Sequence, residues 1–210
     1  MVPVVDFQDV NYCILATTKG RVKRVEMSAF ASVRPSGLIA ISLDDDDQLG
    51  WVCLTGGEGE IMLVSRNGQA LRFAETTIRP MGRQAMGVIG LRLRPGDKLA
   101  GMAAVEPEGS LLVVTDKGFG KRTMLSEYTP KGRATMGVGT IDKKAIDLIG
   151  KVTEALIVQD TDEVSLISSH GIVIRMAVSD ISLQSRVTRG VRIMGLEEGD
   201  TVAAIARIPE

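Results

Sequence analysis

The sequence predicts an all-β, propeller-like domain built from four repeats of about four strands each. Sequence markers recur about every fifty residues, turn signals recur every 8 to 12 residues, and the three-four periodicity of helices is weak. Four short strands in a unit of about fifty residues are typical of propeller blades. We therefore expect one domain over residues 1–210, with approximate blades at 12–54, 60–105, 110–158 and 163–208.

Three markers stay in step over the four repeats. The first is a glycine that closes a short polar turn, where it supplies the positive φ of a tight hairpin. The second is a glycine that opens an apolar strand, and the third is an aspartate ten residues further on. The turn glycines are Gly20, Gly68, Gly118 and Gly171, the strand glycines are Gly37, Gly87, Gly137 and Gly190, and the aspartates are Asp47, Asp97, Asp147 and Asp200.

These markers divide each repeat into four strands. An apolar first strand leads to the turn, and the second strand carries an arginine four residues after the turn glycine. A loop then leads to the third strand, and the fourth strand follows the aspartate. The expected first strands are 12–16, 61–64, 111–114 and 164–167, the third strands 38–43, 88–93, 138–141 and 191–196, and the fourth strands 49–54, 99–105, 148–158 and 202–208.

The formal net charge of −1 hides a strong segregation of charge. The segments 19–43, 66–94, 117–141 and 170–196 run from the turn through the third strand and hold 20 of the 25 basic residues but only 4 of the 26 acidic ones. Because equivalent residues of a repeat array lie on the same side of every unit, this excess predicts a continuous positive band. Such a band attracts phosphate and displaces counterions, so it indicates nucleic-acid binding.

The predicted DNA-contacting residues fall into two groups. The arginines of the second strands recur in register, and for them a structural role and a phosphate contact are equally open. The basic residues of the loops vary in register, as surface contacts allow, and we expect them to contact phosphate. The full set is Arg24, Arg34, Arg72, Arg79, Arg83, Lys121, Arg122, Lys131, Arg133, Arg175, Arg186 and Arg189.

Several classes of function have no support in the sequence. One histidine and two cysteines cannot supply a convincing zinc site, and no carboxylate pair or nucleophile–base set indicates an active site. The acidic runs 44–47 and 160–163 lack the spacing of calcium loops. No apolar run approaches the length of a membrane helix, and aromatic residues are too rare for base stacking. We expect no catalytic residue, metal or cofactor in this chain, and free thiols at Cys13 and Cys53.

The residues resemble one family in combination. Segment 12–24, with 38–41 and 43–44 after it, is similar to a blade of the DNA gyrase A C-terminal domain, and segments 118–122 and 131–138 fit equally well. The resemblance implies a β-pinwheel, in which neighbouring blades exchange strands and duplex DNA wraps around the basic outer edge to support negative supercoiling. It implies as partners double-stranded DNA, gyrase B and the rest of the gyrase A chain, with ATP and magnesium needed only by the holoenzyme. It also implies a bacterial cytoplasmic, nucleoid-associated location, no membrane contact and a monomeric isolated domain.

The sequence departs from that family in two ways. Only four repeats are visible, where about six are usual, and the hallmark heptapeptide Gln-Arg-Arg-Gly-Gly-Lys-Gly is absent; segments 81–87 and 131–137 are degenerate relatives of it. We therefore expect a chain that lacks the leading blades. Two alternatives stay open: the equivalent domain of topoisomerase IV, which guides decatenation, and a propeller that serves as a protein-interaction scaffold with no role on DNA.

Overall fold

The computed structural model describes residues 10–32 and 36–209, which form four small antiparallel sheets. Blade 1 contains β1 (Tyr12–Thr17), β2 (Arg21–Glu26), β3 (Leu49–Thr55) and β6 (Val88–Ile89). Blade 2 contains β4 (Glu60–Ser65), β5 (Gln69–Ala74), β7 (Leu99–Ala104) and β10 (Val138–Gly139). Blade 3 contains β8 (Ser110–Thr115), β9 (Phe119–Met124), β11 (Val152–Val158) and β14 (Val191–Arg192), and blade 4 contains β12 (Glu163–Ser168), β13 (Val173–Ala177) and β15 (Val202–Ile208). The predicted all-β, propeller-like fold is confirmed.

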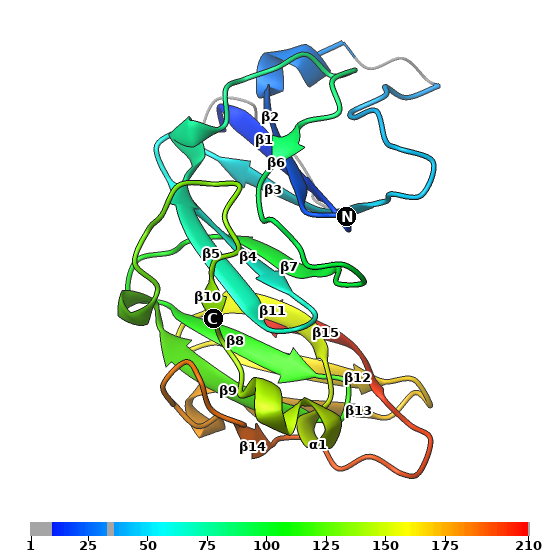
Figure 1. The fold of residues 1–210 in the computed structure, drawn as a ribbon, viewed down its shortest axis with the longest axis vertical. Coiled ribbons are helices and arrows are strands. Elements are labelled where there is room, and N and C mark those ends of the chain that lie inside the picture. Colours follow the sequence, from blue (N-terminus) through cyan, green and yellow to red (C-terminus); the bar gives the residue numbers. More distant parts are fainter. Residues whose placement is uncertain (1–9, 33–35, 210) are drawn as a thin grey trace.

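Blade 1 lies at the top of Figure 1, blade 2 lies below it, and blades 3 and 4 share the lower part of the picture. Within blades 1 to 3 the strand orders are β3-β1-β2-β6, β7-β4-β5-β10 and β11-β8-β9-β14, and blade 4 is β15-β12-β13. In these orders, the strand named first in each blade contacts the strand named first in the next blade: β3 contacts β7, β7 contacts β11, and β11 contacts β15. These four strands therefore form the inner side of the array. The strands at the opposite end of each sheet, β6, β10, β14 and β13, therefore lie at the outer edge.

Neighbouring blades exchange strands at the outer edge. The outer strand of blade 1 is β6, which belongs to the second sequence repeat and pairs with β2 through Arg21↔Ile89 and Val22↔Val88. In the same way, β10 of the third repeat pairs with β5, and β14 of the fourth repeat pairs with β9. The strand glycines allow this close approach: a Cβ on Gly87 would lie 2.5 Å from the Val22 carbonyl oxygen. The exchange implied by the resemblance is thus present.

The hydrophobic core lies between consecutive sheets. Ile14 and Val22 of blade 1 pack with Ile61, Leu63 and Phe73 of blade 2 in one buried cluster. Equivalent clusters join blade 2 to blade 3 and blade 3 to blade 4. Each sheet therefore buries its face against the next one, as the apolar first strands predicted.

Three details differ from the strand predictions. The third strands of the second, third and fourth repeats are only two residues long, and each pairs with the second strand of the preceding blade. Segment 38–43 is not in a strand among the described residues. The fourth strand of the third repeat begins at Val152 rather than at 148, because Lys143–Ala145 forms a 3-10 turn and Ile146–Ile149 forms the short helix α1.

The described part of the chain contains no helix of the length and apolarity needed to cross a membrane.

Candidate nucleic-acid interface

Three loops lie along the outer edge, and we call segments 79–87, 129–137 and 183–190 the rim loops. Each starts with a backbone hydrogen bond to the recurrent arginine position of the preceding blade and ends at a strand glycine. The hydrogen bonds run from Met81 N to Arg24 O at 2.9 Å, from Lys131 N to Arg72 O at 2.8 Å and from Gln184 N to Arg122 O at 2.8 Å. The blade repeat therefore sets each loop at the same place on its neighbour.

Each rim loop also contacts the segment that follows the strand glycine of the previous repeat. Ala85 O accepts from Ser42 N at 3.4 Å, and Thr135 O accepts from Arg92 N at 2.9 Å. Thr188 O accepts from Asp142 N at 3.1 Å. The three loops and these segments thus form one continuous edge across blades 1 to 3.

The predicted loop residues are exposed to different degrees. Arg79, Lys131 and Arg189 are exposed, and Arg83, Arg133 and Arg186 are half-buried. Acidic side chains lie near two of them. The Nε of Arg186 is 3.8 Å from a Glu127 carboxylate oxygen, and the Nε of Arg189 is 3.5 Å from one of Asp142. Both pairs are long and partly exposed to water, which screens them, so they are weak.

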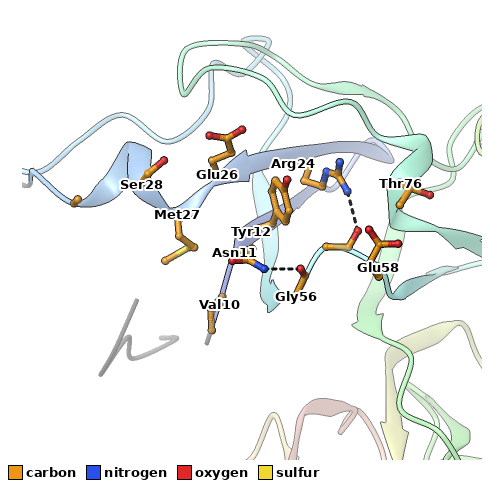
Figure 2. A pocket seen from close by; sticks show the side chains of 12 residues that line it. Val10, Asn11, Tyr12, Arg24, Glu26, Met27, Ser28, Gly56, Glu58 and Thr76 are labelled. Atoms are coloured by element: carbon orange, nitrogen blue, oxygen red, sulfur yellow. Dashed lines mark hydrogen bonds between the residues drawn. The ribbon is translucent and has the colours of Figure 1, made fainter. Parts of the chain in front are cut away.

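Two of the recurrent second-strand arginines are buried. Arg24 is 7% exposed and Arg122 is 6% exposed. Figure 2 shows Arg24 over the ring of Tyr12, with its guanidinium carbon 4.3 Å from the ring centroid and its Nη1 donating to Gly57 O at 3.2 Å. Arg122 donates from Nε to Ile181 O at 2.8 Å and forms an ion pair with Asp160. Their burial favours the structural role that the sequence left open.

The other two recurrent arginines are paired within their own hairpins. Arg72 forms hydrogen bonds to Glu60 at 2.5 and 2.8 Å and donates to Leu125 O at 2.9 Å. Arg175 forms an ion pair with Glu163, and its side chain is 59% exposed. Arg34, also predicted as a DNA contact, lies outside the described residues.

Lys121 is buried rather than on the surface, with 2% of the residue exposed. Its Nζ donates to Ser185 O at 2.6 Å, to Thr188 Oγ1 at 3.0 Å and to Arg186 O. Burial lowers the pKa of Lys121 to about 8, because an ammonium loses its hydration there. A side chain in this position does not reach a phosphate at the surface.

The structure also reveals basic residues at the edge that were not among the predicted contacts. Arg92 and Arg192 are exposed next to the rim loops, and the guanidinium of Arg192 lies 5.3 Å from the Phe119 ring centroid. Both fall in the basic segments of the charge pattern, so that pattern was the available signal. Lys23 is fully buried, and nothing in its local sequence distinguishes it from an exposed lysine.

The pocket in Figure 2 lies at one end of blade 1 and has a volume of about 550 Å³. Arg24 and Tyr12 line it, but so do Glu26 and Glu58. Because basic and acidic side chains share the pocket, it does not concentrate positive charge as the rim loops do.

Comparisons with known proteins agree with this architecture. The family model described as DNA gyrase C-terminal domain, beta-propeller, matches residues 11–49, 59–106, 109–145 and 162–209. The DNA gyrase A protein of Halalkalibacterium halodurans is 50% identical over 208 residues, which cover 99% of this chain and 25% of that protein. The chain thus spans about a quarter of the length of the curated relatives it matches.

Two solved structures share the fold over nearly the whole chain. The C-terminal domain of DNA topoisomerase IV superposes with a TM-score of 0.91 at 30% identity, over 99% of this chain and 65% of that one. The DNA gyrase A C-terminal domain superposes with a TM-score of 0.88 at 26% identity, over 98% of this chain and 68% of that one.

Proposed function

The chain belongs to the DNA gyrase C-terminal domain family, and from this premise we propose that it binds double-stranded DNA along the rim loops and bends it around the outer edge. In this proposal the chain is an accessory domain of a type II DNA topoisomerase and supplies no catalytic residue or cofactor of its own. It acts in the bacterial cytoplasm, at the nucleoid. The rest of the gyrase A chain and gyrase B, with ATP and magnesium, carry out strand passage, and the bent DNA gives that passage the direction of negative supercoiling.

One observation carries the proposal: three basic loops follow one another along a single edge. Since each loop rests on the blade before it, the spacing of the loops is the spacing of the blades, and a duplex that follows them must curve with the array. Phosphate contacts made in this way are independent of base sequence. The side chains that we propose as contacts are Arg79, Arg83, Lys131, Arg133, Arg186 and Arg189, joined by Arg92 and Arg192.

The buried or internally paired residues have a different role in this proposal. Arg24, Arg72, Lys121 and Arg122 hold the blades and rim loops together, because their donors are directed at backbone carbonyls and carboxylates of the fold. Arg175 is exposed, but it lies on β13, away from the three rim loops. We therefore do not include these five residues among the proposed contacts.

Topoisomerase IV gives the second candidate function, because its C-terminal domain superposes well with this chain. In that case the same edge would hold a DNA segment for decatenation. The absence of the gyrase heptapeptide from the sequence favours this alternative, while the curated relatives, which are gyrase A proteins, favour the first.

A topology experiment tests the proposal. Nicked circular DNA is incubated with increasing protein, sealed with ligase and analysed for linking number. A change in linking number that grows with protein supports wrapping and gives its sign. Binding measured in parallel should weaken linearly in log affinity against log salt, with a slope of roughly −0.9 per phosphate contacted. A salt-independent interaction, or none, contradicts the proposal and leaves the protein-interaction scaffold as the better interpretation.

A further inference from the structure

The rim loops are held to the blades in two different ways. Positions three residues after the turn glycine are occupied by Lys23 in blade 1, Leu71 in blade 2 and Lys121 in blade 3. All three side chains are buried. The two lysines lie under the rim loop of the following repeat, and Leu71 packs in the apolar cluster between blades 1 and 2. The two lysines bring an ammonium to that place, and the leucine does not.

The ammonium of each lysine donates to at least one backbone carbonyl of a rim loop. Lys121 Nζ has three acceptors: Ser185 O at 2.6 Å, Arg186 O, and Thr188 Oγ1 at 3.0 Å. Three acceptors satisfy all three protons of an ammonium. Lys23 Nζ donates to Ala40 O at 2.8 Å and to Arg83 O. Because no carboxylate touches either ammonium within the described residues, backbone carbonyls, together with the Thr188 hydroxyl at Lys121, compensate the buried charge.

The blade that lacks the lysine holds its loop with the loop's own arginine. Arg133 donates from Nε to Thr77 O at 3.0 Å and from Nη1 to Ile89 O at 3.2 Å. Gln69 Nε2 adds a hydrogen bond to Met136 O at 2.8 Å. The guanidinium of Arg133 is therefore partly used to fix the loop on which it lies.

The equivalent arginines of the other two loops are not used in this way. Arg83, Arg133 and Arg186 each lie four residues before the strand glycine of their loop. Within the described part of the chain, the guanidinium of Arg83 has no hydrogen-bond partner, and that of Arg186 has only the long ion pair to Glu127 at 3.8 Å. The lysine-held loops thus present an arginine whose donors are available to a ligand.

We propose that Lys23 and Lys121 are positioning residues of the rim: each buried ammonium replaces the loop arginine as the donor that fixes the loop backbone, and so leaves Arg83 or Arg186 free to bind an anion. The identity of that anion as a DNA phosphate rests on the function proposed above. The fixing of the loop backbone by the lysine does not rest on that function, because it can be measured without DNA.

The first experiment is hydrogen exchange on Lys121→Met, a change that keeps the length of the side chain and removes its donors. We expect amide exchange in segment 183–190 to become about tenfold faster or more, while β8 stays protected as in the wild type. Lys98→Met is the matched control, because Lys98 is exposed in the turn before the inner strand β7. Unchanged exchange in 183–190 overturns the proposal. If Lys121→Met does not fold, Thr188→Val removes one of the three acceptors and must give the same local effect in smaller size.

The second experiment is a double-mutant cycle on the affinity for a long linear duplex. We expect Lys121→Met and Arg186→Ala each to lower the affinity by roughly three- to tenfold, and Arg186→Ala to cost less than about twofold in the Lys121→Met background. Non-additivity is expected because both changes remove the same arginine–phosphate contact. Fully additive effects overturn the positioning role. If the wild type shows no salt-dependent DNA binding, the proposed function fails, and the exchange result still decides whether the lysine positions the loop.

A pH profile separates positioning from a general loss of stability. Burial lowers the pKa of Lys121, and the charged groups near its ammonium are Glu127, which opposes that shift, and Arg186, which adds to it. The ammonium therefore loses a proton, and one of its three hydrogen bonds, as the pH rises through about 8. Wild-type DNA affinity should fall between about pH 7 and pH 9, and that of Lys121→Met should stay flat. A pH dependence shared by both proteins contradicts the proposal.

Discussion

Asp116 fills the space where a side chain on Gly150 would lie, since a Cβ built on Gly150 would be 1.9 Å from Asp116 Oδ1. That same oxygen accepts a hydrogen bond from Lys151 N at 3.0 Å. In the other three blades, an aspartate at the position of Gly150 caps the turn between the first two strands. The hydrogen bonds run to Asp47 from Lys19 N at 3.0 Å, to Asp97 from Asn67 N at 3.1 Å and to Asp200 from His170 N at 3.1 Å.

Blade 3 therefore keeps a carboxylate at this contact, but the carboxylate is that of Asp116 in the turn, and it accepts from Lys151 N, the amide that follows Gly150. Asp147, the marker aspartate of the third repeat, does not take the place that Asp47, Asp97 and Asp200 occupy, because it is exposed on α1 and the carboxylate at this contact is that of Asp116. The inserted helix displaces Asp147 from the turn. Gly150 then takes the φ of +84° that carries the chain from the helix into β11.

We predict that Gly150→Ala lowers the free energy of unfolding by roughly 2–4 kcal/mol, since the new Cβ meets the Asp116 carboxylate and the backbone has a positive φ. Asp116→Ala alone should cost about 1 kcal/mol through loss of the hydrogen bond to Lys151 N. The double variant should be more stable than the sum of the two costs implies, because the clash is gone. Urea denaturation of all four proteins measures this coupling, and strict additivity contradicts the steric explanation.

Glu154 on β11 accepts a hydrogen bond from Trp51 Nε1 of β3 at 3.4 Å, and this contact joins blade 3 to blade 1. Burial raises the pKa of Glu154 to about 7, although the hydrogen bond from Trp51 opposes the shift. The folded protein therefore keeps the proton at a pH where the unfolded chain has lost it, and stability falls as the pH rises from about 4.5 to about 7.

We predict that Glu154→Gln removes this slope and stabilises the protein by roughly 1–3 kcal/mol at pH 8, because the amide keeps an acceptor for Trp51 and carries no charge. Urea denaturation of wild type and variant between pH 5 and pH 8 measures it. Parallel stability curves for the two proteins would show that Glu154 does not titrate as its burial requires.

Cys13 and Cys53 are free thiols, as the sequence predicted. Their strands pair in the register Cys13↔Leu54 and Ile14↔Cys53, so the two side chains point to opposite faces of the sheet. Burial raises the pKa of Cys53 to about 12 and also raises that of Cys13. We predict that a thiol reagent such as DTNB at pH 8 modifies neither cysteine in the native protein and both in 6 M guanidinium. Fast modification of the native protein contradicts this burial.

Arg122 and Arg189 should respond in opposite ways to replacement by alanine. Arg122 donates to Ile181 O at 2.8 Å and to Ser179 O at 3.4 Å, so Arg122→Ala should cost roughly 2–4 kcal/mol of stability. The side chain of Arg189 is 63% exposed, so Arg189→Ala should change stability by less than about 0.5 kcal/mol. Under the proposed function, Arg189→Ala should also flatten the salt dependence of DNA binding by about one unit. Thermal denaturation and a salt titration separate the two roles.

The sequence by itself determined the repeat, the first two strands of each blade and the basic loops. A tight turn needs a residue that can adopt a positive φ, and a buried strand needs apolar side chains. These local requirements are the same in each blade, so glycine and apolar residues recur at the same positions. That is why Gly20, Gly68, Gly118 and Gly171 all have a positive φ where the pattern predicted one. The rim loops, too, lie where the excess of basic residues indicated.

Only the tertiary structure decided which basic residues are buried. Lys121 and Arg122 are adjacent to each other on one strand, and both are covered by residues about 60 positions later in the sequence. The replacement of a missing aspartate by Asp116 likewise depends on a turn more than thirty residues away. Local patterns cannot report such contacts, because the free energy of a buried charge depends on the acceptors that the fold brings to it.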